Sequence, residues 1–144
     1  MRYALNPAFR TPREDKNILL MAERVKELTH KEKSRIIVQG THALLYYADR
    51  YGWPFSFERG DDISPYYRLM NWEKLPKDKW ERRNEAFKTP IGTVRYLREE
   101  EGATHFVVSE REIFHREKSF SDYMYKTCQV IYQDEGIGII FSLF

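Results

Sequence analysis

Hydrophobic residues recur at helical spacing near the start of the chain and then give way to a short unbroken hydrophobic run. The first segment opens with Thr11, Pro12 and Glu14, which supply a capping hydroxyl, a proline at the first helical position and an acid three residues after the cap. Its hydrophobic positions predict a helix with one buried face: Ile18, Met21, Ala22, Val25 and Leu28. The following run, RIIVQG at 35–40, predicts a strand covered on both faces, as in a mainly parallel sheet.

Residues 41–58 predict a second helix and a second strand. Thr41 can cap this helix, and Gly52 is placed to end it in the left-handed conformation, with Pro54 just beyond. The apolar side of the helix consists of Leu44, Leu45, Tyr47 and Ala48. The alternating segment PFSFE, at 54–58, then predicts a strand.

The next part of the chain alternates between helix and strand again. Residues 59–80 show no sustained period and are interpreted as a loop with one short helical turn. Thr89 and Pro90 begin a new helix, which ends at Gly102. Its apolar positions are Ile91, Val94 and Leu97. The segment THFVVS, at 104–109, predicts another buried strand.

The C-terminal part predicts a partly helical segment and a hairpin. Residues 110–127 are interpreted as helical in part, and the candidate inward positions are Ile113, Phe114, Tyr123 and Met124. The segments 128–134 (CQVIYQD) and 137–144 (IGIIFSLF) are separated only by Glu135 and Gly136. This spacing predicts a terminal β-hairpin.

The order of these elements predicts one α/β domain over residues 1–144, folded as a three-layer sandwich. Helical crossovers favour parallel neighbours, whereas the closing hairpin makes the sheet mixed. We expect one sheet to contain residues 35–39, 104–108, 128–134 and 137–143, the last two paired antiparallel.

Composition and charge narrow the possible functions. The chain has 24 Lys and Arg against 22 Asp and Glu, and the signs are mixed along its length. Even the basic cluster KDKWERR, at 77–83, interleaves acids, as on a solvated helix face. We therefore expect no nucleic-acid partner. The longest apolar run, at 137–144, is far shorter than the roughly 20 residues of a membrane helix, and the N-terminus lacks the apolar core of a signal peptide.

Residues that carry chemistry are few and dispersed. Cys128 is the only cysteine, so no internal disulfide and no cysteine-based zinc site can form, and we interpret it as a small core residue. The four histidines (His30, His42, His105 and His115) show no metal-binding spacing, and His105 is interpreted as a core or edge residue. Asp61 and Asp62 beside Gly60 either hold a metal-bound sugar nucleotide or form a solvated turn. We predict no catalytic residue, no metal site and no cofactor.

Two motifs carry a resemblance to a known class of enzymes. The first is matched by Leu44, Leu45, Tyr46, Tyr47, Arg50, Gly52 and Trp53, and the second by Gly102, Ala103, Phe106, Val107 and Val108. In this order, before the final VIYQDEGIGIIFSL, they resemble the C-terminal soluble domain of membrane-embedded glycosyltransferases of the GT-C class. The relatives concerned are those of the dolichyl-phosphate-mannose–protein mannosyltransferases and the lipid A aminoarabinose transferases. The resemblance covers residues 14–144, although His42-Ala43 and His105-Phe106 depart from the usual pattern.

This resemblance implies a function at a membrane. The parent protein would transfer a sugar from a polyprenyl-phosphate carrier at the extracytoplasmic face, with its catalytic acid in a loop between membrane helices. The present chain would then be a non-catalytic domain, soluble as an isolated fragment, with residues 1–12 as a linker from a preceding membrane segment. Its partners would be the membrane-embedded portion of the same protein and a glycan or lipid-phosphate ligand.

The candidate ligand-binding residues are Tyr46, Tyr47, Arg50 and Trp53. In a structural role, Arg50 pairs with an acid, either Asp49 or one from the 58–62 loop, and braces the turn around a buried Trp53. In a recognition role, the four form a shelf at the carboxyl end of the strands, where rings suit sugars and arginine suits phosphate. In either role we expect them to cluster around one helix-to-strand turn, with Gly52 at positive φ.

Two other functions remain open from the sequence. The chain is alternatively a free-standing cytoplasmic α/β domain that binds a small ligand or a protein partner. It is also compatible with a small enzyme that uses the loop of Asp61 and Asp62 together with His42.

Overall fold

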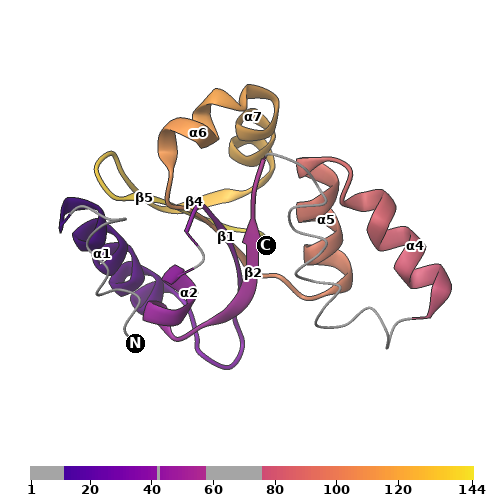
Figure 1. Ribbon diagram of the computed structural model, residues 1–144, viewed down its shortest axis with the longest axis horizontal. Helices are drawn as coiled ribbons and strands as arrows, with labels where there is room; N and C mark the ends of the chain where they lie inside the picture. Colours follow the sequence, from indigo (N-terminus) through magenta and orange to yellow (C-terminus); the bar gives the residue numbers. More distant parts are fainter. Residues whose placement is uncertain (1–11, 42, 58–75) are drawn as a thin grey trace.

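The computed structural model describes residues 12–41, 43–57 and 76–144, with the side chains of the first helix described from Lys16 onward. The described elements, in chain order, are α1 (Pro12–Leu28), β1 (Arg35–Gln39), α2 (Ala43–Ala48), β2 (Tyr51–Phe55), α4 (Lys77–Ala86), α5 (Pro90–Glu100), β3 (His105–Val108), α6 (Arg111–Arg116), α7 (Lys118–Thr127), β4 (Gln129–Asp134) and β5 (Gly138–Ser142) (Figure 1). None of these helices has the length and hydrophobicity that a bilayer crossing requires.

The strands form one open, mixed sheet in the order β2-β1-β3-β5-β4. β1 pairs in parallel with β2 and β3, whereas β5 pairs antiparallel with both β3 and β4, so the sheet is mixed but not mainly parallel, because β5 returns beside β3 without a helical crossover to reverse it. The prediction that the four expected strand segments share a sheet and that the chain closes with an antiparallel hairpin is confirmed. With six helices among the described residues, the protein belongs to the α/β class, as predicted.

Side chains of the central strands alternate between two hydrophobic clusters. In β1, Ile36 and Val38 pack with α1 and α2, whereas Ile37 packs with α5, α6 and α7. β3 divides in the same way, with Val107 in the first cluster and Phe106 in the second. Because successive strand residues point to opposite faces, helices cover both faces of the sheet (Figure 1). This explains why the strand sequences are hydrophobic without interruption.

The ends of α5 follow from its sequence. The Thr89 side chain accepts a hydrogen bond from the Gly92 amide at 3.0 Å, and Pro90 occupies the first turn. At the other end Gly102 has a φ of 82°, and the Ala103 amide donates to the Leu97 carbonyl at 2.9 Å. The predicted start and stop of this helix are therefore confirmed.

The helical part of 110–127 consists of two short helices, α6 and α7. Of the predicted inward residues, Phe114 and Met124 are fully buried, and Ile113 and Tyr123 are half-buried. In α1, by contrast, the predicted inward residue Leu28 is exposed, because the helix ends there and the chain turns away before β1.

The boundary between α2 and β2 differs from the prediction. The helix ends at Ala48, and Asp49 rather than Gly52 takes the left-handed conformation, with a φ of 55°. The amides of Asp49 and Arg50 donate to the carbonyls of Tyr46 and Leu45, which closes the helix in the manner of a Schellman motif. Aspartate tolerates this conformation better than most residues. The strand consequently begins at residue 51, three residues earlier than predicted.

A second difference concerns the expected loop at 59–80. Its C-terminal part belongs to α4, which starts at Lys77 after Pro76. A proline has no amide hydrogen and fits just before a helix, so the start is set by backbone chemistry rather than by hydrophobic periodicity. Residues 58–75, including Asp61 and Asp62, lie outside the described residues, as does His42.

Gly52 is required because β1 and β2 approach each other closely, and not because its φ is positive. It lies in β2 directly opposite Ile36 of β1, and a Cβ placed on it would lie 1.8 Å from the Ile36 carbonyl oxygen. The nearest atom is main chain, so the two strands would have to separate.

We predict that Gly52→Ala lowers the free energy of unfolding by about 1–3 kcal/mol, the usual cost of overpacking a tight contact. Urea unfolding of the purified chain measures this. Gly136→Ala is the matched control, because a Cβ there meets its nearest neighbour only at 3.5 Å. Equal stability of the two variants would contradict the close approach of β1 and β2.

Candidate functional site

The Arg50 side chain lies between α2 and β2 and makes five hydrogen bonds. Its Nε donates to Thr29 Oγ1 at 2.8 Å. Nη1 donates to the carbonyls of Ala48 and Asp49 at 3.2 and 3.1 Å. Nη2 donates to the carbonyls of Lys26 and Thr29, both at 3.2 Å. A guanidinium has five N–H donors, so every one has an acceptor within the fold.

These contacts give Arg50 a structural role. Lys26 and Thr29 lie at the C-terminal end of α1, where carbonyls lack helical partners and a positive charge is favourable. The predicted pair with the Asp49 carboxylate is wrong, since Arg50 meets carbonyls and a hydroxyl, and the other predicted partners, the acids at 58–62, lie outside the described residues. The Asp49 carboxylate instead pairs with Lys31 at 2.7 Å, and this hydrogen bond lowers the pKa of Asp49.

Tyr46, Tyr47 and Trp53 do not share one surface. Tyr46 is 69% exposed, and its ring meets that of Tyr47 edge-on at 5.5 Å. Tyr47 packs with the α1 and α2 cluster, whereas the half-buried Trp53 packs with the cluster on the other face of the sheet. Trp53 pairs with Ile37, whose side chain also points to that other face. The prediction that the four residues cluster around one turn is therefore wrong.

The position of this turn differs from the prediction as well. Arg50 immediately precedes β2, so the turn lies at the amino end of the parallel strands rather than at their carboxyl end. In open α/β sheets, the usual ligand crevice lies at the carboxyl ends.

At that carboxyl edge, the chain leaves β1 toward α2 and leaves β3 toward α6, on opposite faces of the sheet. Such a switch point is a preferred place for ligands. Here Ser109 Oγ occupies it, donating to the Gln39 carbonyl at 2.7 Å and accepting from the Thr41 amide at 3.3 Å. A Cβ on Gly40 would lie 2.0 Å from Ser109 Oγ. The protein's own polar groups thus fill the space between these two strand ends.

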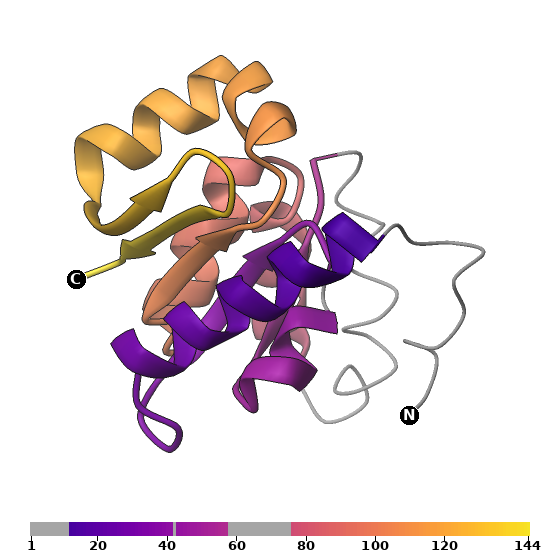
Figure 2. The same cartoon turned by 90° about the vertical axis from the view of Figure 1, so that its left-hand side faces the viewer.

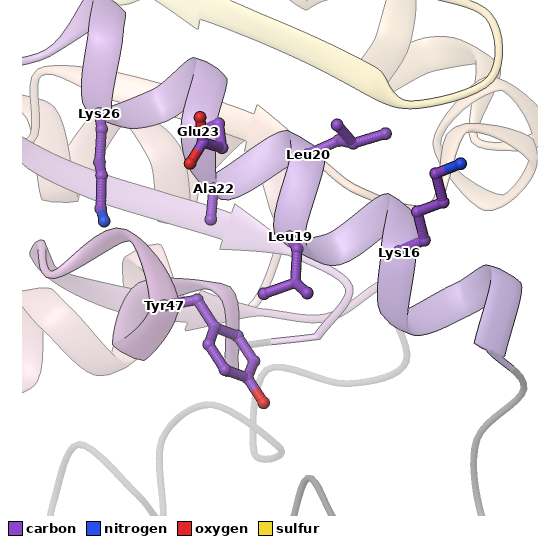
Figure 3. A pocket seen from close by; sticks show the side chains of 7 residues that line it. All are labelled: Lys16, Leu19, Leu20, Ala22, Glu23, Lys26 and Tyr47. Atoms are coloured by element: carbon purple, nitrogen blue, oxygen red, sulfur yellow. The ribbon is translucent and has the colours of Figure 1, made fainter.

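A groove lies instead between α1 and α2. Its volume is about 390 Å³, and it is lined by Lys16, Leu19, Leu20, Ala22, Glu23, Lys26 and Tyr47 (Figure 3). The Tyr47 ring and the Leu19 side chain lie near each other along it, and Lys26 points from α1 toward α2 (Figure 3). Leu19 is 50% exposed and shares its side of α1 with the exposed residues Lys16, Glu23 and Lys26. The groove thus combines a hydrophobic wall, an aromatic ring and two ammonium groups.

Among the described residues, the exposed large hydrophobic side chains are those of Leu19, Leu28, Tyr46, Tyr51, Tyr125 and Phe144. Of these, Leu19 lines the groove, whereas Tyr51 lies on the same face of β2 as Trp53, across the sheet. Tyr47 is the predicted site residue that the groove contains; the exposure of Leu19 had no signal in the sequence.

His105 and Cys128, which the sequence also singled out, have contacts that serve the fold. His105 is half-buried, its Nδ1 lies 2.7 Å from Thr104 Oγ1, and burial lowers its pKa. Cys128 is half-buried and packs against the cluster of α5, α6 and α7. Within the described part of the chain, no group of three or more His, Cys, Asp or Glu side chains is arranged to hold a metal ion.

Comparisons with known proteins add no relative. No protein-family model, curated protein or solved structure matches this chain. The choice of site therefore rests on the contacts of the described residues.

We predict that Arg50→Ala lowers the free energy of unfolding by about 2–3 kcal/mol, because several carbonyls lose a charged donor at once. Arg82→Ala is the matched control, since that side chain is 55% exposed and, within the described part of the chain, pairs with Glu100 at 3.3 Å. Its loss should stay within about 1 kcal/mol. Urea unfolding measures both variants, and an unchanged midpoint for Arg50→Ala would refute its structural role.

We also predict that His105 makes stability depend on pH. Burial lowers its pKa in the folded state below that of the unfolded chain, about 6.5. The unfolded state therefore binds a proton first as the pH falls, and stability decreases from about pH 6.5 downward. In His105→Gln the decrease in melting temperature between pH 7 and pH 5 should be smaller than in the wild type. Identical slopes would exclude this contribution.

Proposed function

We propose that the chain is a non-catalytic α/β domain, arranged as a three-layer sandwich, of a membrane glycosyltransferase that uses a polyprenyl-phosphate sugar donor. The domain acts at the extracytoplasmic face beside the membrane-embedded portion of the same protein. It contributes to recognition of the donor or the acceptor and leaves the chemistry to the membrane-embedded portion. It requires no cofactor.

The observation that carries this proposal is the complete use of the Arg50 guanidinium inside the fold. Arg50 is the one charged residue of the first resemblance motif, and it holds two helices against the sheet. Other members of that motif also serve the fold. Leu44 is fully buried, and the lack of a side chain at Gly52 allows β1 to lie close to β2. In a domain without a catalytic role, we expect the residues of such a motif to stabilise the fold and to include no acid–base pair.

The second motif forms the neighbouring part of the same unit. Ala103 is buried beside the end of α5, and Phe106, Val107 and Val108 are buried in β3, which pairs with β1. The two motifs, widely separated in the sequence, thus contribute to the parallel part of one mixed sheet. This arrangement supports a resemblance between the folds of the two kinds of domain.

The α1–α2 groove is the surface best suited to the donor. A polyprenyl-phosphate combines a hydrocarbon chain with an anionic head. Leu19 and the Tyr47 ring offer apolar contact, while Lys16 and Lys26 offer positive charge. Glu23 lies between the lysines along the helix, so the anion is expected at one end of the groove and the hydrocarbon along the leucines.

The test requires the complete reading frame that encodes this domain, expressed in membranes and assayed for transfer from polyprenyl-phosphate-mannose. We expect Leu19→Ser combined with Tyr47→Ser to raise KM by about tenfold with little change in kcat, because the groove would supply binding that is equal in ground and transition states. Leu28→Ser is the control: an exposed leucine on the same helix that does not line the groove. The purified 144-residue chain should transfer no sugar, with or without divalent metal.

Turnover by the isolated chain would disprove the accessory role. A reading frame without hydrophobic membrane segments would disprove the membrane context and favour a free-standing domain that binds a small ligand or a protein partner.

A further inference from the structure

The two lysines of the α1–α2 groove lie on different sides of α1. The two helices lie side by side over one face of the sheet (Figure 2). Leu19 and Lys26 extend from α1 toward the side on which Tyr47 lies, whereas Lys16 extends away from Tyr47 (Figure 3). Lys26 is therefore the ammonium group that shares one side of the groove with the leucine and the aromatic ring.

The Lys26 ammonium group is accessible and unpaired. The side chain is exposed, and its nitrogen makes no hydrogen bond or ion pair within the described part of the chain. Asp49, at the end of α2, is already paired with Lys31 at 2.7 Å. Only the main-chain carbonyl of Lys26 is used by the fold, as an acceptor for Arg50. A change of the side chain therefore leaves that contact in place.

The charges around Lys26 favour an anion. A helix C-terminus normally disfavours negative charge, because carbonyls without partners carry partial negative charge there. Here Arg50 donates to the carbonyls of Lys26 and Thr29, which offsets this effect. The pKa of Asp49 is lowered, first by its hydrogen bond with Lys31 and further by the charges of Arg50 and Lys26. Three cations therefore act at this end of the groove.

The acids near the groove do not cancel this charge at the Lys26 end. Glu23, one turn before Lys26, adds a second carboxylate to that of Asp49, so two acids stand against three cations. At the other end, residues 13–16 (REDK) contain two bases and two acids in sequence. The excess of positive charge thus lies where the apolar wall of the groove also lies.

The size of the groove limits the apolar part of a ligand. An apolar cavity of about 150 Å³ holds one benzene molecule, so a five-carbon isoprene unit needs roughly 125 Å³. The groove has a volume of about 390 Å³ and therefore has room for about three such units.

We propose that Lys26 binds the phosphate of a prenyl phosphate whose first three isoprene units lie along Leu19 and Tyr47. This site rests on the proposed function and refines it. The phosphate of the donor lies at the Lys26 end, and the remaining hydrocarbon extends beyond the groove. Lys16 makes no contact with the phosphate.

Calorimetric titration of the purified chain with farnesyl phosphate, below its micelle concentration, measures the site. Lys26→Gln should weaken binding by about threefold to tenfold, as expected for one charged contact at an exposed position. Lys16→Gln is the matched control, because it makes the same change on the same helix, and it should change binding less than about twofold. Lys26→Arg should restore most of the affinity. Farnesol, which lacks the phosphate, should bind at least about threefold more weakly than farnesyl phosphate.

The length of the prenyl chain provides a second readout. Geranyl phosphate, with two isoprene units, should bind about threefold to tenfold more weakly than farnesyl phosphate, because less apolar surface is buried. Geranylgeranyl phosphate, with four units, should bind about as tightly as farnesyl phosphate. Absent binding, equal losses in the two lysine-to-glutamine variants, or a further gain of affinity with the fourth unit would overturn the proposal.

These measurements separate the ligand's orientation from the proposed function. In the complete reading frame, a raised KM for Leu19→Ser with Tyr47→Ser, together with no dependence of binding on Lys26, would retain the proposed function and reject this site. A reading frame without membrane segments, together with the expected dependence on Lys26 and chain length, would reject the membrane function and support the site.

Discussion

The guanidinium of Arg50 joins the C-terminal ends of α1 and α2 at the point where β2 begins. Helix C-termini present carbonyls without helical partners, and one planar cation with five donors satisfies several at once. Because β2 starts at the next residue, this contact also sets the start of the edge strand. Gly52 then faces Ile36, and the two strands approach to a distance that no side chain at position 52 permits. The remaining sheet extends from this pair through β3 to the hairpin.

The groove between α1 and α2 follows from how the sheet separates its two faces. On one face, α1 and α2 leave a groove in which a leucine and a tyrosine lie beside lysines, a combination suited to an amphiphilic ligand. On the other face, α6, α7 and β4 direct polar atoms toward the Tyr125 hydroxyl. Arg50 has no donor left for a ligand, and Arg111 fastens α6 to the hairpin through the Glu135 carbonyl.

Much of the fold could be predicted because its signals are local. Thr89, Pro90 and Gly102 carry the start and stop of α5 in their own backbone chemistry. The continuous apolar runs of β1 and β3 predicted strands covered on both faces, and the short spacing at Glu135 and Gly136 predicted the hairpin. The candidate site was less predictable. Tyr46 and Tyr47 are neighbours as expected, but Trp53 lies across the sheet from them because strand residues alternate between faces.

The sequence by itself determined the α/β class, the strand segments of the sheet and the architecture of the hairpin, since each depends on periodicity or on turn residues within a few positions. Only the tertiary structure decided the end of α2, the role of Gly52 and the partners of Arg50. Asp49 could replace glycine at the helix end because Arg50, held by acceptors 21 and 24 residues away, stabilises the turn that follows. Contacts over such separations leave no periodic trace in the sequence, because they depend on which helix packs beside which strand.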